Sequence, residues 1–86
     1  MKKGMAGSLE SNDALIIVSE NDKLEIKIES IVYEFYGEDI FNVVAKTLNE
    51  LNLNKVKVEV SDKGALDYTI KARLITAIKR MEENDA

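Results

Sequence analysis

The residues whose types and spacing could do chemistry lie in a short polar stretch near the N-terminus, Ser8–Asp13, which reads Ser-Leu-Glu-Ser-Asn-Asp. Ser11 stands between Glu10 and Asn12. A serine hydroxyl becomes a nucleophile when a neighbouring base activates it, but this chain contains no His and no Cys. Ser11 is therefore either an ordinary turn residue, since Ser, Asn and Asp favour turns, or a hydroxyl to which a covalent group is attached.

A second polar segment lies near the other end of the chain. Residues 62–67 read Asp-Lys-Gly-Ala-Leu-Asp, and residues 69–73 read Thr-Ile-Lys-Ala-Arg. Together with Gly-Ser-Leu-Glu-Ser at 7–11 and the following Asp13, they resemble the two signatures of the citrate lyase acyl carrier protein, the gamma subunit. The similarity extends from Ala6 to about Arg80, so it covers nearly the whole chain.

The resemblance implies a role for one residue of the first motif. In that family the second Ser of the motif is modified, and this Ser corresponds to Ser11. The group is a phosphoribosyl-dephospho-CoA, an arm similar to phosphopantetheine, joined covalently through a phosphodiester. The family often has Cys and Arg where this chain has Tyr68 and Lys71; neither position is the attachment site. Since the chain has no Cys, any thioester must form on a thiol that the prosthetic group supplies.

The same resemblance implies a function and a set of partners. The chain would be a non-catalytic carrier that presents acetyl and citryl thioesters to the alpha (transferase) and beta (lyase) subunits, which cleave citrate to acetate and oxaloacetate. A prosthetic-group transferase would load it. Two alternatives stay open: the acyl carrier subunit of malonate decarboxylase, which uses the same kind of group, and an unmodified protein-interaction module.

Composition limits the other function classes. The 86 residues are enough for one domain, 1–86. The net charge of −4 argues against nucleic acid as the usual partner. The absence of Cys excludes disulfides and cysteine-based metal sites and is compatible with a cytoplasmic location. No metal site is expected. We also expect neither a signal peptide nor a membrane span, because no apolar run is long enough for either.

Charge is unevenly distributed along the chain. Residues 10–39 contain nine acidic and two basic side chains, whereas residues 63–81 contain five basic side chains and one acidic side chain. The basic segment is either a solvated helix face or a surface that docks partners or steadies phosphates. Arg73 and Arg80, seven residues apart on one flank, are the candidates for this docking role.

The attachment loop needs a scaffold, and the hydrophobic pattern predicts one. Residues 1–7 contain two Gly and no periodicity, which indicates a flexible leader. The apolar run 14–18 and the alternating run 23–29 predict two strands joined as a β-hairpin. The alternating run 55–60 predicts a third strand, which would place opposite charges side by side if it lies next to 23–29.

Two helices complete the predicted scaffold. Ser30 is a candidate N-cap for a helix over 31–52 that is kinked or broken near Gly37, with 38–52 as its clearest part. A second helix is expected over 66–81, with a frayed tail at 83–86. The aromatic residues of the first helix are predicted to be core or interface residues rather than a ligand face: Tyr33, Phe35, Tyr36 and Phe41.

The predicted order is therefore β-β-α-β-α. Two amphipathic helices require a common apolar surface, and the apolar side of a small sheet provides it. The fold class expected is α+β, a two-layer sandwich with a small, mostly antiparallel sheet and both helices on one face.

Overall fold

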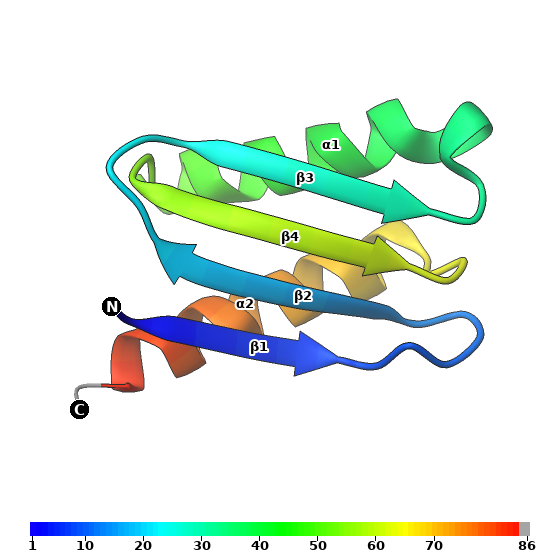
Figure 1. The fold of residues 1–86 in the computed structure, drawn as a ribbon. Helices are drawn as coiled ribbons and strands as arrows, with labels where there is room; N and C mark the ends of the chain where they lie inside the picture. The colour runs from blue at the N-terminus through cyan, green and yellow to red at the C-terminus, as the bar shows by residue number, and fades with distance from the viewer. Residues whose placement is uncertain (85–86) are drawn as a thin grey trace.

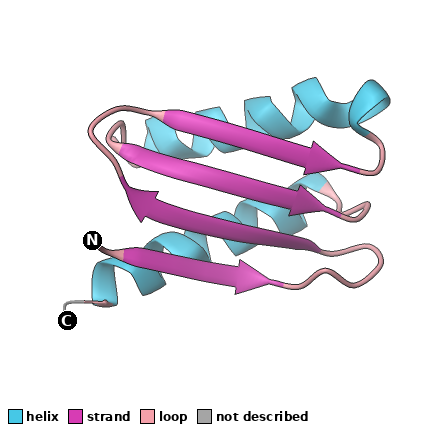
Figure 2. Ribbon diagram, in the orientation of Figure 1, coloured by secondary structure: helices cyan, strands magenta, loops and turns pink. Residues whose placement is uncertain are grey.

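Both helices pack on the same face of a four-stranded sheet in the computed structural model, which describes residues 1–84 (Figure 1). The elements follow in the order β1 (Lys3–Gly7), β2 (Ala14–Glu20), β3 (Glu25–Ser30), α1 (Tyr33–Glu50), β4 (Val56–Asp62) and α2 (Asp67–Glu83). The two layers, one of strands and one of helices, are distinct in Figure 2. The predicted α+β class with both helices on one face is confirmed.

The sheet order differs from the prediction. The strands lie in the order β1-β2-β4-β3, so β4 separates β2 from β3 and the expected hairpin between them is wrong. β2 pairs antiparallel with β1 and β4, whereas β3 pairs parallel with β4. The physical reason is burial: the inward Val side chains of β4 are buried, whereas Ile26 and Ile28 of β3 are only partly buried. The more apolar strand therefore occupies the centre, and α1 provides the crossover that a parallel pair requires.

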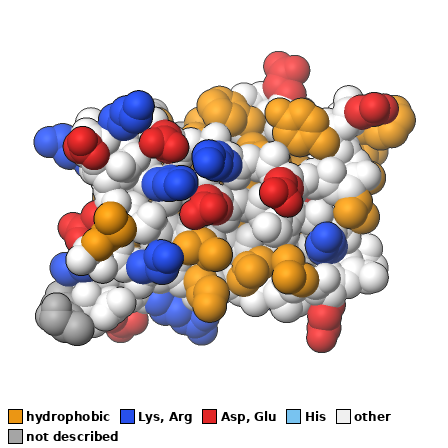
Figure 3. All heavy atoms as spheres, viewed as in Figure 1, with side chains coloured by type: hydrophobic (Ala, Val, Ile, Leu, Met, Phe, Trp, Pro, Cys, Tyr) orange, Lys and Arg blue, Asp and Glu red, His pale blue; other side chains and the backbone are white. Residues whose placement is uncertain are grey.

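The condition for pairing of opposite charges between the two alternating strands is met, because β3 lies next to β4. In the parallel register Glu25 lies opposite Lys57 and Lys27 lies opposite Glu59. These side chains occupy the face of the sheet away from the helices, where Figure 3 shows acidic and basic side chains interspersed. Alternating signs between adjacent strands favour this register over a shift that would align like charges.

The prediction of a flexible leader is wrong, because residues 3–7 form the edge strand β1. The sequence Lys-Gly-Met-Ala-Gly has little intrinsic strand propensity, but its small residues face α2. Gly4 and Ala6 are buried, and a side chain at Gly4 would collide with the backbone of Ala77 and Met81 in α2. The edge strand therefore depends on close contact between two backbones, which the hydrophobic pattern does not reveal.

Helix α1 is continuous from Tyr33 to Glu50, so the break expected near Gly37 is absent. Gly37 is buried, and a Cβ added there would meet the ring of Tyr33 at 2.7 Å. The expected cap is also different. Val32 occupies the N-cap position without a side-chain cap, and the Ser30 hydroxyl instead accepts a hydrogen bond from the Val32 N–H at 3.1 Å.

The core lies between the inner face of the sheet and the two helices. It consists of aliphatic residues and one Met: Ala6, Ala14, Ile16, Val18, Ile40, Val44, Leu48, Val56, Val58, Val60, Ile70, Leu74, Ala77, Ile78 and Met81. The predicted apolar stripe of α1 enters this core from Ile40 onwards, whereas Tyr33 and Tyr36 stay exposed. α2 remains helical at Glu83, and the Asn84 amide donates to the Lys3 carbonyl at 3.2 Å. The rest of the predicted frayed tail, residues 85 and 86, lies outside the described residues.

Candidate functional site

Ser11 lies at the corner of the loop that joins β1 to β2. The Asp13 N–H donates to the Glu10 carbonyl at 3.2 Å and closes a turn across residues 10–13. Asn12 follows Ser11 with φ of 66°, a left-handed conformation that Asn tolerates better than most residues. Ser11 is exposed, and its hydroxyl makes no hydrogen bond to any residue between 1 and 84. The sequence-predicted attachment residue is thus an accessible hydroxyl.

The base of this loop is held by the loop that follows β4. The Asn12 N–H donates to the Lys63 carbonyl at 2.8 Å, and the Lys63 N–H donates to the Asp13 carbonyl at 2.9 Å. These bonds continue the antiparallel pairing of β2 and β4 beyond Ala14 and Asp62. The two motifs recognised in the sequence therefore meet at one end of the sheet, through residues as far apart in sequence as Asp13 and Lys63.

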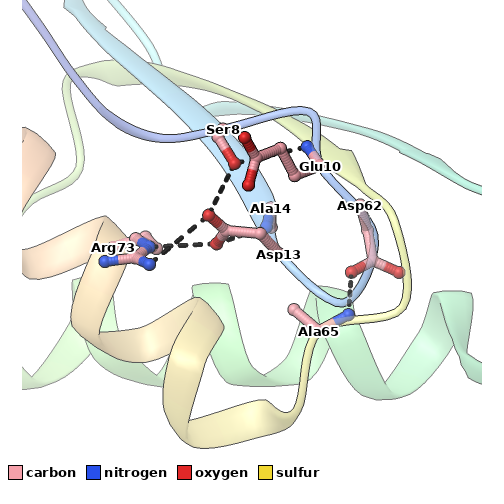
Figure 4. Close-up of polar contacts among 7 residues, drawn as sticks. All are labelled: Ser8, Glu10, Asp13, Ala14, Asp62, Ala65 and Arg73. Atoms are coloured by element: carbon pink, nitrogen blue, oxygen red, sulfur yellow. Dashed lines mark hydrogen bonds and ion pairs between the residues drawn. The ribbon is translucent and has the colours of Figure 1, made fainter.

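A network centred on Asp13 fixes the start of β2 (Figure 4). Its carboxylate accepts hydrogen bonds from Arg73 Nε at 3.0 Å, the Ser8 hydroxyl at 2.8 Å and the Ala14 N–H at 2.8 Å. Bonding by Arg73, by Ser8 and by the Ala14 backbone lowers the pKa of Asp13 from 3.8 to about 2. The Ser8 hydroxyl also accepts from the Glu10 N–H at 3.3 Å. The network thus orders the residues on both sides of Ser11 without using its hydroxyl.

Asp62 forms a second anchor at the same end of the molecule. Its side chain is 2% exposed and accepts hydrogen bonds from the Ser30 hydroxyl at 2.8 Å and the Ala65 N–H at 2.9 Å. A buried carboxylate is tolerated only when it is hydrogen-bonded in this way. Asp62 therefore joins the end of β3, the end of β4 and the approach to α2. The roles of Asp13 and Asp62 do not follow from the motifs alone; the signal available in the sequence is an Asp at the boundary of each of the apolar strands β2 and β4.

The two arginines singled out from the sequence both contact the N-terminal part of the chain. Arg73 binds Asp13, and Arg80 donates from Nη1 to the Met5 carbonyl at 2.9 Å. Both therefore connect α2 to β1 or to its loop. Whether they also dock a partner or phosphates stays a prediction.

A groove of about 570 Å³ opens between the first turns of α1 and α2. Tyr36, Leu66 and Tyr68 form its apolar walls, with Asp39 and Asp67 among its acidic residues. Its lining also includes Gly64, and a Cβ at Gly64 would lie 3.6 Å from Asn12 Oδ1. The groove therefore begins next to the loop that contains Ser11.

The described residues also define what kinds of site are absent at this end. In the 84 residues that the structure describes, no cluster of three or more acidic side chains is placed to hold a metal ion. No helix within residues 1–84 is long and apolar enough to cross a membrane. The site can present a hydroxyl on an ordered loop, and its own side chains supply no activated nucleophile.

Known proteins share both the sequence and the fold. Residues 1–81 match the model of the family described as malonate decarboxylase delta subunit. The citrate lyase acyl carrier protein of Treponema denticola is 39% identical over 82 residues, which are 95% of this chain and 94% of that protein. The same-named protein of Lactiplantibacillus plantarum is 46% identical over 80 residues, 92% of this chain and 83% of that protein.

A solved structure shows the same fold. A chain in the crystal structure of a Pseudomonas malonate decarboxylase hetero-tetramer in complex with malonate superposes with a TM-score of 0.76. The superposition covers 95% of this chain and 82% of that chain at 15% identity. Because the sequence identity is so low, this similarity shows that the two chains share a fold and does not show that they share an activity.

Proposed function

The chain belongs to the citrate lyase acyl carrier protein family, and we propose that its acyl groups are attached through a prosthetic group on Ser11. As a member of this family the chain is a non-catalytic carrier subunit and not an enzyme. The observation that supports Ser11 most directly is the contrast within one loop. The Ser11 hydroxyl is exposed and bonds to nothing in residues 1–84, whereas the Ser8 hydroxyl is engaged by Asp13 and Glu10.

The residues present fit a large group on Ser11. A phosphodiester to phosphoribosyl-dephospho-CoA needs an accessible oxygen with free space around it, and the corner of the turn provides both. The group would supply the thiol that thioester chemistry requires, since the chain has no Cys. Arg73 and Arg80 were proposed from the sequence as phosphate or docking contacts. Their bonds to Asp13 and to the Met5 carbonyl support a positioning role alongside that proposal.

The proposed cycle uses the carrier as a tether. An acyl group held on the loop reaches the alpha (transferase) and the beta (lyase) subunits at a high effective concentration, without diffusing away between them. The ordered base of the loop favours this task, because it fixes where the arm starts while leaving the arm itself free. The substrate would be citrate, the products acetate and oxaloacetate, and the location the cytoplasm.

Intact-mass measurement tests the attachment. The full chain is incubated with the prosthetic-group transferase and its precursor, beside the variants Ser11→Ala and Ser8→Ala. We expect the wild type and Ser8→Ala to gain the mass of the group and Ser11→Ala to gain none. Full mass gain by Ser11→Ala would place the arm on another oxygen. No mass gain by any form, wild type included, would leave the unmodified interaction module as the better assignment.

A malonate decarboxylase carrier is the second candidate, because the matching family model is described by that enzyme's delta subunit. Reconstitution separates the two. The loaded chain is combined with the alpha and beta subunits of citrate lyase, or with the remaining subunits of malonate decarboxylase. Consumption of citrate only in the first mixture supports the citrate lyase assignment, and consumption of malonate only in the second would replace it.

A further inference from the structure

All five aromatic residues of this chain are outside its core. The chain has three Tyr and two Phe, and their exposed fractions range from 45% to 78%: Tyr33, Phe35, Tyr36, Phe41 and Tyr68. Large aromatic side chains normally contribute most of their area to a core or an interface. The five lie on the first half of α1 and the first turn of α2, so this end of the helical layer has the composition of an interface.

Two of these aromatic residues, Tyr36 and Tyr68, line the groove between α1 and α2, and the charged residues of the groove are all of one sign. Its ten lining residues include three acidic side chains, Asp39, Asp62 and Asp67, and no Lys or Arg. Asp62 is buried and bonded to Ser30 and Ala65, so the two exposed residues Asp39 and Asp67 determine the charge at the rim. An occupant with phosphates or carboxylates, such as the proposed arm or a citryl group, would be repelled. A cationic side chain with an apolar stem would instead be attracted by the two carboxylates, and its stem would fit the apolar walls of the groove.

We propose that this groove is the docking site for a subunit of the carrier's own complex, which inserts an arginine or lysine side chain between Tyr36 and Tyr68. The apolar stem of such a side chain would pack on the tyrosine rings and its charge would face Asp39 or Asp67.

The groove lies next to the loop that contains Ser11, which connects the proposed docking to the proposed carrier function. Gly64 lines the groove and lies beside Asn12, the residue after Ser11. A subunit seated in the groove is therefore next to the origin of the arm. The inference rests on the proposed carrier function, because that function provides the reason for a partner at this end of the molecule.

Binding measurements on the full chain test the proposal. Dissociation constants are measured for the purified alpha subunit and the purified beta subunit, with the variants Tyr68→Ala and Asp39→Asn/Asp67→Asn. We expect at least a tenfold weaker binding to one of the subunits for each variant, and a weaker salt dependence for the double Asn variant. The matched control is Asp22→Asn/Leu24→Ala, an exposed acidic and an exposed apolar residue in the β2–β3 connection. It should bind like the wild type.

Several outcomes would overturn the docking site. Binding of both groove variants as tight as that of the wild type, with melting temperatures unchanged, would reject the surface while leaving the carrier function intact. Self-association of the wild type that Tyr68→Ala abolishes would identify a second copy as the occupant. Shifts of the Tyr36 and Tyr68 signals on attachment of the group, without any partner, would identify the arm. Failure of the wild type to bind either subunit and to gain mass would remove the carrier function itself.

Discussion

At the scale of single residues, the loop between β1 and β2 is ordered by the side chain of Asp13, while the hydroxyl of Ser11 stays accessible. Asp13 receives three kinds of donor, a guanidinium, a hydroxyl and a backbone N–H, from residues that flank the loop in sequence or face it from α2. Charge-assisted bonds of this type are stronger than neutral ones and fix geometry. The Ser11 hydroxyl takes no part in this network, so the proposed attachment of a group to Ser11 would leave these contacts in place.

The Asp13 network predicts a pH dependence of stability. The pKa of Asp13 is about 2 in the folded chain against an ordinary value of 3.8. Because the folded pKa is lowered, the carboxylate contributes stability above about pH 4 and loses that contribution as the pH falls towards 2. We expect Asp13→Asn to melt at a lower temperature than the wild type near neutral pH, with the difference closing between pH 4 and 2. Melting curves by circular dichroism measure this.

The control for this experiment is Asp22→Asn, which removes an exposed acidic side chain from the β2–β3 connection. Its melting temperature should follow that of the wild type at every pH. A constant difference between Asp13→Asn and the wild type from pH 5 to pH 2 would contradict the role of the Asp13 carboxylate, because a merely steric effect does not titrate.

At the scale of elements, β1 is the part of the fold that depends most on backbone proximity. It covers the edge of β2 and packs against α2, where Arg80 and Asn84 donate to its Met5 and Lys3 carbonyls. These contacts attach β1 to the last turns of α2, and Figure 1 shows these two elements side by side. The strand that precedes the Ser11 loop is therefore fixed by α2, the helix that contains residues 69–73 of the second motif.

Substitution at Gly4 tests this element. We expect Gly4→Ala to destabilise the chain by about 1–3 kcal/mol, the usual range for overpacking, because its new methyl would meet backbone atoms of Ala77 and Met81. Urea denaturation measures the free energy of unfolding. Met5→Ala is the neighbouring control, since Met5 is 53% exposed and should change stability little. If residues 1–7 were a flexible leader, Gly4→Ala would be neutral or slightly stabilising.

At the scale of the whole molecule, the sequence predicted what periodicity encodes. The β-branched run of β2, the alternation in β3 and β4, and the stripe of α1 from Ile40 gave the class and the helical layer. Strand order was not predictable in the same way, since it depends on relative burial and on long-range pairing. β1 was missed because two of its five residues are Gly, whose role is close approach and not propensity.

In the candidate site, too, the sequence predicted features that a local motif encodes and did not predict contacts between distant residues. Ser11 could be predicted as the attachment residue because the resemblance assigns that role to one position of a local motif, and the attachment itself stays a prediction. The roles of Asp13, Arg73 and Asp62 could not be predicted, since Arg73 is 60 residues from its partner Asp13 and the Ser30 donor is 32 residues from Asp62. The exposure of the aromatic residues could not be predicted either, because a helical stripe predicts a buried face only where another layer covers it. At Tyr33 and Tyr36 the stripe extends onto the exposed end of α1.

At the same scale, buried aliphatic residues and exposed aromatic residues are expected to contribute differently to the stability of the fold, and one comparison of two variants tests this. Leu74 is fully buried in the aliphatic core, whereas Phe35 is 78% exposed. We expect Leu74→Ala to lower the free energy of unfolding by about 2–5 kcal/mol, a large part of the total of about 4–13 kcal/mol typical for this length. Phe35→Ala, although it removes a larger side chain, should change it by less than about 0.5 kcal/mol. Urea denaturation of both variants measures the contrast; a loss at Phe35 as large as that at Leu74 would show that the aromatic end supports the fold and is not reserved for a partner.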